Sequence, residues 1–340
     1  MPRATISQVA ELAGVSTATV SRALSDSRRV SATTRQRVQD AAQKLGYSGN
    51  SIASALRRNR TDTVGMVVPS ITNPFFTSLV ENVEHVLQEQ GRQLFLCDSR
   101  QDAEVEARHL RSLLARQVDG IIISPCHDRH SGAAVQAAAK RIPLVQLDRQ
   151  VSGTSTDWVG VDDHEAMRLL MEHLDERGAR SAAFVTSTMT NSSTQLRLIG
   201  FRTQAQRLGI HTREEWIQLG DYSVAWGRAA GRRIMDDTPR PDAIVCADDL
   251  IAIGVLRACR DRSVAVPDDV QVTGYDDIDF ADFVHPGLTT VRQPRERIAA
   301  EAVRLLAATA EWGGTAAHTA LAPTLVIRGS TAQRARTGGV

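Results

Sequence analysis

The sequence predicts a small all-α helix-turn-helix head followed by an α/β core of two doubly wound parallel-sheet lobes. In residues 1–60, apolar residues recur at helical spacing and basic residues are frequent. From Thr63 onward, short β-rich runs alternate with helical stretches, which is typical of parallel sheets covered on both faces. We expect four segments: a head at 1–48, a hinge helix and linker at 49–60, the core at 61–330 and a disordered tail at 331–340.

The composition is that of an ordinary globular protein, with 42% hydrophobic and 23% charged residues and a mean hydropathy of −0.21. No apolar run approaches the roughly 18 residues that a membrane span needs, and no apolar segment follows Met1. The four cysteines lie far apart without a C-x-x-C pair, which predicts reduced, buried thiols rather than disulfides or a zinc site. We therefore expect a cytoplasmic protein with no membrane partner.

Charge is distributed unevenly along the chain. Of its 40 Lys and Arg and 39 Asp and Glu, ten and three respectively lie in residues 1–60, so this segment carries a net charge of +7 and the rest −6. A basic head on a mildly acidic body indicates a polyanion-binding module attached to a part with a different task. The alternative is a solvated basic face without a partner.

Three short helices are predicted in the head, each starting after a capping side chain: Thr5 to Gly14, Ser16 to Leu24, and Ser31 to Gly46. Gln8 stands at the capping-box position of the first helix. Two short helices joined by a Gly-containing turn form a helix-turn-helix, and the +7 charge favours DNA binding over an ordinary three-helix bundle. The apolar positions expected in the core of the head include Val9, Ala13, Val20 and Leu45.

The run from Thr5 to Arg22, including Ala13-Gly14-Val15-Ser16 and Thr19-Val20-Ser21-Arg22, resembles the DNA-binding head of the lactose-repressor/galactose-repressor family. The resemblance implies that Thr17, Ala18 and Arg22 face base edges in the major groove, with Arg22 suited to a bidentate guanine contact. It also implies that a set of hydroxyl side chains contacts the DNA, mostly at its phosphates: Thr5, Ser16, Thr19, Ser21 and Ser31.

Residues 50–58 resemble the hinge helix of the same family. Nine residues are fewer than the roughly 12–15 that an isolated helix needs, so this segment should fold only when paired with its dimer mate on DNA. Leu56 is then the wedge in the minor groove, with Asn50 and Arg57 beside the DNA. Gly49 stands where the family usually has Pro. The predicted partners are therefore a second copy of the chain and a pseudo-palindromic operator.

Ten strands are predicted in the core: Val64–Pro69, Gln93–Asp98, Gly120–Ser124, Leu144–Asp148, Val159–Asp162, Ala182–Thr186, Ile217–Gly220, Ala243–Ala247, Val270–Tyr275 and Thr289–Gln293. Ten strands suit two lobes, one at about 61–160 with 292–323 and the other at about 161–291 with 324–330. Ligands of doubly wound folds bind beyond the carboxyl ends of the strands.

Polar and aromatic residues gather at these strand ends: Asn73, Phe75, Phe76, Asp148, Arg149, Arg197, Tyr222, Asp248, Asp276 and Gln293. Carboxylates and guanidinium groups that pair with hydroxyls, together with flat rings that stack on a pyranose, are typical of a carbohydrate site. We expect an effector site here, with no metal and no cofactor.

The core resembles the periplasmic sugar-binding fold that the lactose-repressor family shares, and its site resembles that of the ribose-binding proteins. Asn-Pro-Phe-Phe at 73–76, Asp-Arg-Gln at 148–150, and Arg197 before Gly200-Phe201 carry this resemblance. Asp248 stands where those proteins have Asn, and Tyr222 where they have Phe. The resemblance implies a repressor that a small sugar releases from its operator, and ribose, another pentose or hexose, or a nucleoside stays open.

Two other functions compete with this interpretation. One is a corepressor-dependent or global catabolite regulator controlled by a purine or a protein partner. The other is a sugar-processing enzyme, suggested by the adjacent acids at 162–163, 248–249 and 276–277. No His joins these acids at ligand spacing, and no G-x-S-x-G, P-loop or G-x-G-x-x-G is present, so we expect no enzymatic activity.

Overall fold

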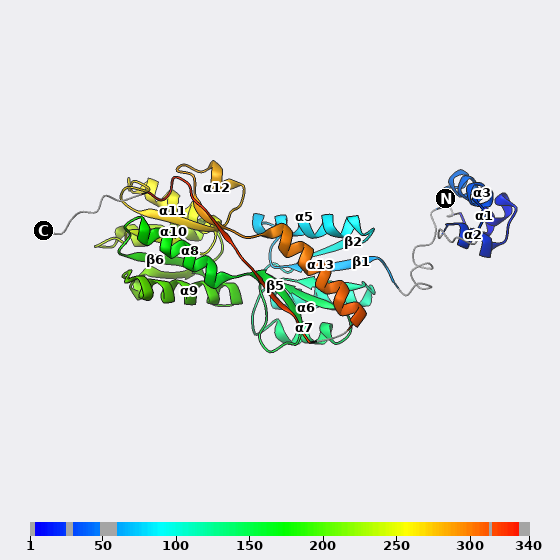
Figure 1. Cartoon of the computed structure of the whole chain (residues 1–340), viewed down its shortest axis with the longest axis horizontal. Coiled ribbons are helices and arrows are strands. Elements are labelled where there is room, and N and C mark those ends of the chain that lie inside the picture. Colours follow the sequence, from blue (N-terminus) through cyan, green and yellow to red (C-terminus); the bar gives the residue numbers. More distant parts are fainter. Residues whose placement is uncertain (1–3, 25–29, 48–59, 313–314, 333–340) are drawn as a thin grey trace. The chain divides into compact units, whose positions relative to one another are not determined.

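The computed structural model describes residues 4–24, 30–47, 60–312 and 315–332. The chain forms two compact units, Met1–Asp62 and Thr63–Val340, which are described separately (Figure 1). The predicted DNA contacts Asn50, Leu56 and Arg57 lie outside the described residues, as do positions 333–340 of the predicted tail.

The head contains the three predicted helices, α1 (Ile6–Ala13), α2 (Thr17–Leu24) and α3 (Ala32–Lys44). A capping box starts α1, since the Thr5 N–H donates to Gln8 Oε1 at 2.8 Å and the Gln8 N–H donates to Thr5 Oγ1 at 3.4 Å. Gly14 ends α1 in the left-handed region, at φ 62°. The predicted helix-turn-helix is therefore confirmed.

A small apolar core holds the three helices together, built from Val9, Ala10, Ala13, Val20, Ala23, Val38, Ala41 and Ala42. Leu45 does not belong to it, because Leu45 is the C-cap of α3 and its side chain is 37% exposed. The prediction of a core position for Leu45 is wrong, since the apolar face of α3 ends one turn earlier.

Lobe 1 is built on a six-stranded sheet in the order β11-β5-β4-β3-β1-β2, whose paired strands all run parallel. Its strands are β1 (Thr63–Val68), β2 (Gln93–Asp98), β3 (Gly120–Ile123), β4 (Leu144–Leu147), β5 (Asp157–Val161) and β11 (His318–Leu321). One apolar cluster joins the sheet to α5 (Pro74–Glu89) and α13 (Arg295–Trp312). A second cluster joins it to α6 (Ala103–Ala115) and α7 (Gly132–Ala139).

Lobe 2 has a sheet in the order β12-β10-β9-β8-β6-β7, in which only β12 runs antiparallel to its neighbour. Its strands are β6 (Ala182–Ser187), β7 (Ile217–Gly220), β8 (Ala243–Cys246), β9 (Gln271–Asp276), β10 (Thr289–Arg292) and β12 (Thr324–Val326).

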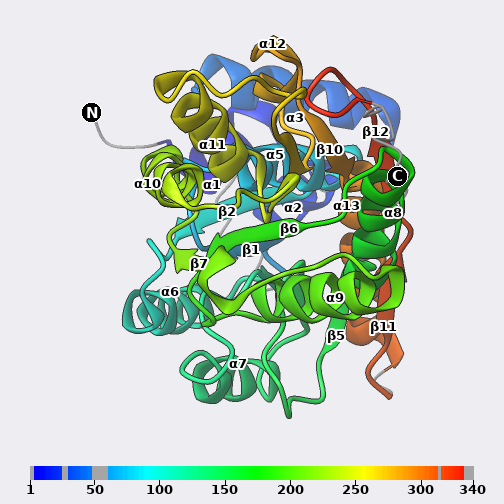
Figure 2. The same ribbon diagram turned by 90° about the vertical axis from the view of Figure 1, so that its left-hand side faces the viewer.

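Helices cover both faces of the lobe 2 sheet. One apolar cluster joins it to α8 (Asp163–Glu176) and α9 (Ser192–Leu208), and another joins it to α10 (Val224–Asp236) and α11 (Asp249–Asp261). Figure 2 shows α9 on one side of β6 and β7, and α10 and α11 on the other. Two short elements lie between strands of lobe 2 along the sequence: the 3-10 helix Glu214–Trp216 and the helix α12 (Phe280–Phe283).

The two doubly wound lobes confirm the predicted fold class, and all ten predicted strands are present. The strands β11 and β12 were not predicted. The chain passes between the lobes three times, after β5, after β10 and between β11 and β12 (Figure 1). Three chain segments therefore connect the two lobes, and the carboxyl ends of both sets of strands belong to the same compact unit.

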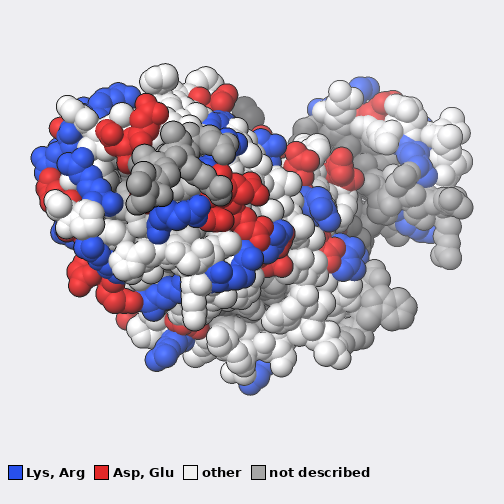
Figure 3. All heavy atoms as spheres, turned by 60° about the vertical axis from the view of Figure 1, so that its left-hand side comes forward, with Lys and Arg blue, Asp and Glu red and all other residues white. Residues whose placement is uncertain are grey.

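The predicted buried thiols are also observed, since all four cysteines are free and buried. Within the described parts of the chain, no helix is both long enough and apolar enough to cross a membrane. Basic and acidic side chains are interspersed on the face of the core that Figure 3 presents.

Candidate functional site

The second helix of the head presents an exposed polar face. Thr17, Ala18 and Arg22 are all exposed, and the Arg22 Nε donates to the Ala18 carbonyl at 3.1 Å. The Thr19 N–H donates to Ser16 Oγ at 3.2 Å, which caps the start of α2. The side chains that the sequence predicts at base edges are thus on the surface of the helix that follows the turn.

The remaining predicted hydroxyls of the head play local roles in the structure as well. Thr5 caps α1, and Ser31 caps α3 through the Thr34 N–H at 3.3 Å, while Ser21 is half-buried in α2. Both caps lie at helix N-termini, where unpaired backbone N–H groups favour a phosphate oxygen. These positions therefore suit contacts to a nucleic-acid backbone.

A cleft between the two lobes brings together nine of the ten predicted effector residues. It holds about 250 Å³ of space continuous with solvent and is lined by Asn73, Phe75, Phe76, Asp148, Arg149, Ser193, Arg197, Tyr222, Asp248 and Asp276. Gln293 does not line it, and instead donates from Nε2 to Asp276 Oδ1 at 2.7 Å. Ser193 was not predicted, although it lies in the first turn of α9, beside residues that were.

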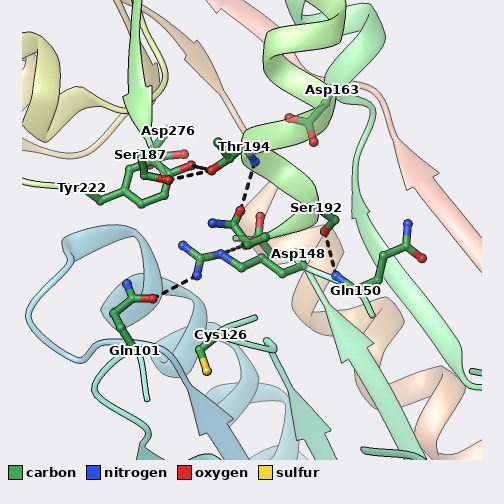
Figure 4. Close-up of polar contacts among 12 residues, drawn as sticks. Gln101, Cys126, Asp148, Gln150, Asp163, Ser187, Ser192, Thr194, Tyr222 and Asp276 are labelled. Carbon is green, nitrogen blue, oxygen red and sulfur yellow. Dashed lines mark hydrogen bonds and ion pairs between the residues drawn. The ribbon is translucent and has the colours of Figure 1, made fainter. Parts of the chain in front are cut away.

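The lobe 1 side of the cleft combines aromatic rings with one cation. Asn73 caps α5 by accepting from the Phe75 N–H at 3.0 Å, which fixes the position of Phe75 and Phe76 in the first turn. The Arg149 guanidinium lies 5.3 Å from the Phe76 ring centroid and 5.5 Å from that of Tyr222 in lobe 2. It also donates to Gln101 Oε1 at 3.3 Å (Figure 4). Arg149 therefore bridges the two halves of the site.

Arg197 is the buried cation of lobe 2. Its Nε donates to Asp163 Oδ1 at 2.9 Å, its Nη1 donates to the Ala247 carbonyl at 2.7 Å, and its guanidinium lies 3.6 Å from the Tyr275 ring centroid. Desolvation alone would lower the pKa of Arg197, but Asp163 and the neighbouring phenols and Asp276 hold that pKa well above its usual value. Arg197 therefore remains a cation in the cleft.

Three carboxylates face the same space, and burial raises the pKa of each. The pKa of Asp148 and that of Asp248 are both raised to about 6, and that of Asp276 is raised well above its usual value. Asp148 and Asp276 have positive φ angles of 63° and 106°, a backbone conformation that costs of the order of 1–3 kcal/mol outside glycine. Such strain is typical of positions held for binding.

Two buried polar atoms of the cleft lining have no hydrogen-bond partner within the described parts of the chain, Ser193 Oγ and Asp248 Oδ2, and Gln293 Oε1, outside the lining, has none either. All three residues are at most 3% exposed. A buried polar atom without a partner costs about 1–3 kcal/mol, and a ligand hydroxyl that reached Ser193 Oγ or Asp248 Oδ2 would remove that cost.

Tyr222 is held in place by a chain of hydroxyls. Its OH lies 2.7 Å from Thr194 Oγ1, which lies 2.7 Å from Ser187 Oγ (Figure 4). The ring is therefore fixed at the mouth of the cleft, where it can stack on a flat or puckered ring.

Of the adjacent acids that suggested an enzyme, some line the cleft and others form hydrogen bonds or ion pairs outside its lining. Asp248 lines the cleft, whereas Asp249 accepts from the Ile278 N–H at 2.8 Å and the Thr290 hydroxyl at 2.6 Å. Burial raises the pKa of Asp249 to about 8. Asp277 likewise pairs with Arg292 at 2.6 Å and Arg328 at 2.8 Å.

Neither acid of the first pair lines the cleft. Asp162 caps α8 by accepting from the Glu165 N–H, and Asp163 pairs with Arg197. No group of three or more His, Cys, Asp or Glu side chains that could hold a metal ion occurs among the residues that the structure describes.

Both parts of the chain match models of known protein families. Residues 5–50 match the model of bacterial regulatory proteins of the lacI family, and residues 171–331 match that of the periplasmic binding protein-like domain.

Similar proteins extend over nearly the whole chain. The transcriptional repressor PurR of Histophilus somni is 30% identical over 303 residues, 89% of this chain and 91% of that protein. The ribose operon repressor of Escherichia coli K12 is 31% identical over 303 residues, 89% of this chain and 92% of that protein. The solved structure of the Lac repressor dimer bound to operator and the anti-inducer ONPF has a TM-score of 0.89 at 27% identity, and the match covers 97% of this chain and 100% of that one. The chain therefore belongs to the lacI family of bacterial regulatory proteins, as a DNA-binding transcriptional regulator with a small-molecule-binding core.

Proposed function

We propose that the protein is a cytoplasmic, homodimeric repressor that binds a pseudo-palindromic operator and is released from it by ribose or a related pentose or nucleoside. The observation that carries this proposal is the buried cleft with three carboxylates, two guanidinium groups and unpartnered polar atoms. Hydroxyl groups both donate to carboxylates and accept from guanidinium groups, so a polyol satisfies the two kinds of side chain at once.

The aromatic side chains of the cleft support a sugar as the effector. Phe76 and Tyr222 supply the flat surfaces on which the apolar face of a sugar can stack.

The second candidate effector is a purine, acting as a corepressor. A relative of nearly full length is named a PurR repressor, and the aromatic residues of the cleft could stack on a base as well as on a sugar. Three buried carboxylates favour the sugar, because they accept hydrogen bonds and a purine base offers fewer donors than a polyol.

An effector bound in the cleft would act on operator binding through lobe 1, and we infer release as the sign of this effect. A ligand between the lobes favours the closed cleft, and a change in lobe 1 reaches the DNA-binding head through residues 49–62. By linkage, an effector that weakens operator binding by a given factor is itself bound more weakly, by that factor, when operator is present. A preference of a hundredfold corresponds to about 2.7 kcal/mol.

Calorimetry of the full chain against ribose, other pentoses, hexoses, nucleosides and purines tests the effector. Titration of operator DNA with and without the saturating ligand tests the sign of control. We expect ribose to bind and to weaken operator binding; tighter operator binding with a purine would support corepression instead. Product analysis after incubation with each sugar should show no turnover, since we propose no enzymatic activity.

A further inference from the structure

Outside the effector cleft, the two lobes meet at the loop that follows β3. In this loop of lobe 1, the Asp128 N–H donates to the Thr190 carbonyl of lobe 2 at 2.8 Å. The Asp128 side chain accepts at Oδ2 from Gln195 Nε2 of α9, also at 2.8 Å. Neither Asp128, Thr190 nor Gln195 lines the cleft.

The first turn of α9 thus has two different surfaces. Ser193 and Arg197 line the effector cleft, whereas Gln195 contacts Asp128, and Ser192 Oγ accepts from the Gln150 N–H at 2.9 Å (Figure 4). Since Asp128 and Gln150 belong to lobe 1, the N-terminal part of α9 contacts the opposite lobe and also lines the cleft. These contacts exist only when the lobes are close together.

The Asp128 carboxylate is well suited to this role. Its side chain is 15% exposed, so the hydrogen bond to Gln195 is largely protected from water. A hydrogen bond to a charged acceptor is about twice as strong as one between neutral groups. On the lobe 1 side, the His127 Nδ1 lies 3.3 Å from Asp128 Oδ1, leaving Oδ2 for Gln195.

We propose that Asp128 and Gln195 form an interlobe latch that stabilises the closed cleft and sets effector affinity without touching the effector. Both are positioning residues, because they act on the ligand only through the distance between the lobes. When the latch holds the lobes together, less of the ligand's binding free energy is needed to close the cleft. The affinity of a ligand that binds the closed state therefore includes the free energy of the latch. The effect on affinity rests on the proposed effector function, but the latch itself can be measured without any ligand.

The variants are Asp128→Ala, Gln195→Glu, and the combination of Asp128→Asn with Gln195→Glu. Gln195→Glu places two carboxylates opposite each other, which should open the latch. The combined change exchanges the amide and the carboxylate between the two positions and keeps their total length, so it should restore the hydrogen bond. Arg129→Ala is the matched control, because Arg129 is an exposed side chain of the same loop.

Hydrogen exchange of the backbone amides in the ligand-free full chain measures opening of the latch directly, in peptides that cover residues 124–131 and 188–196. We expect exchange there to be about threefold to tenfold faster in Asp128→Ala and Gln195→Glu, and to return towards the wild-type rate in the combined variant. Equal exchange in all variants would overturn the latch, and so would failure of the combined variant to slow exchange relative to Gln195→Glu alone.

Titration with ribose supplies the second readout. The two single variants should bind it about threefold to tenfold more weakly, with the combined variant and Arg129→Ala close to the wild type. If no variant and no wild-type protein binds ribose, the proposed effector is wrong, while hydrogen exchange still decides the latch. If wild type and single variants bind ribose equally, the latch does not set effector affinity and that part of the proposal is wrong.

Discussion

Replacing Asp248 with Asn separates the two roles that the structure gives this side chain. Asp248 is the N-cap of α11, where Oδ1 accepts from the Ile251 N–H at 2.7 Å, while Oδ2 is buried at the cleft without a partner in the described chain. Asn is as good an N-cap as Asp, so Asp248→Asn keeps the cap and removes the buried charge.

The pKa of Asp248 determines the size and sign of the effect on stability. Burial raises this pKa from 3.8 to about 6, a shift of roughly two units, so the ionised side chain costs the folded state at most about 3 kcal/mol. The cost is absent well below pH 3.8, where the carboxyl is protonated in both states; it grows between about pH 3.8 and pH 6 and stays constant above that range. Asp248→Asn should therefore raise the melting temperature of the core at pH 7, and the difference from wild type should shrink as the pH falls from 6 to 4.

Calorimetric unfolding from pH 4 to 8 measures this effect. Asp279→Asn is the matched control, because Asp279 is an exposed acid of lobe 2 without a side-chain capping bond. The reasoning is refuted if Asp248→Asn lowers stability at pH 7, or if its stability relative to wild type does not change with pH.

Three further predictions concern the head and the buried pair of lobe 2. Arg22→Ala should lose the preference for operator over random DNA and keep most non-specific binding; equal losses on both DNAs in a binding titration would make Arg22 a phosphate contact. Arg197→Ala should destabilise the core by about 3–5 kcal/mol in calorimetric unfolding as well as weaken effector binding, because it leaves the buried Asp163 with the Tyr275 hydroxyl but without its cation, and adding Asp163→Asn should recover part of that loss. Thr5→Ala should cost the head about 1 kcal/mol of stability in helical circular dichroism melts, because it removes the capping box of α1, and an unchanged melt would show that the cap contributes nothing.

Much of the fold could be predicted because its signals are local. Thr5 with Gln8 and Gly14 mark both ends of α1, and alternating β-rich and helical stretches mark the parallel strands. Caps and hydrophobic periods depend on residues within a turn or a strand of each other, so they are readable along the chain. The strands β11 and β12 lacked such a signal, because they are short, partly exposed edge strands of three or four residues.

The site was predictable as a set of positions, since parallel strands end at one edge of their sheet. What each side chain contacts was not. Asp163 lies 34 residues from Arg197 in the sequence and 2.9 Å from it in the fold, and Gln293 lies behind Asp276 instead of in the cleft.

The sequence by itself determined the two kinds of domain, most of their elements and the chemical character of the cleft. Tertiary structure decided which acids face that cleft and which ones support it, as with Asp248 and Asp249, two neighbours that differ in every contact. The physical reason is that burial and pairing depend on how the two lobes and their helices pack, whereas the elements themselves depend on bonds between near neighbours in the chain.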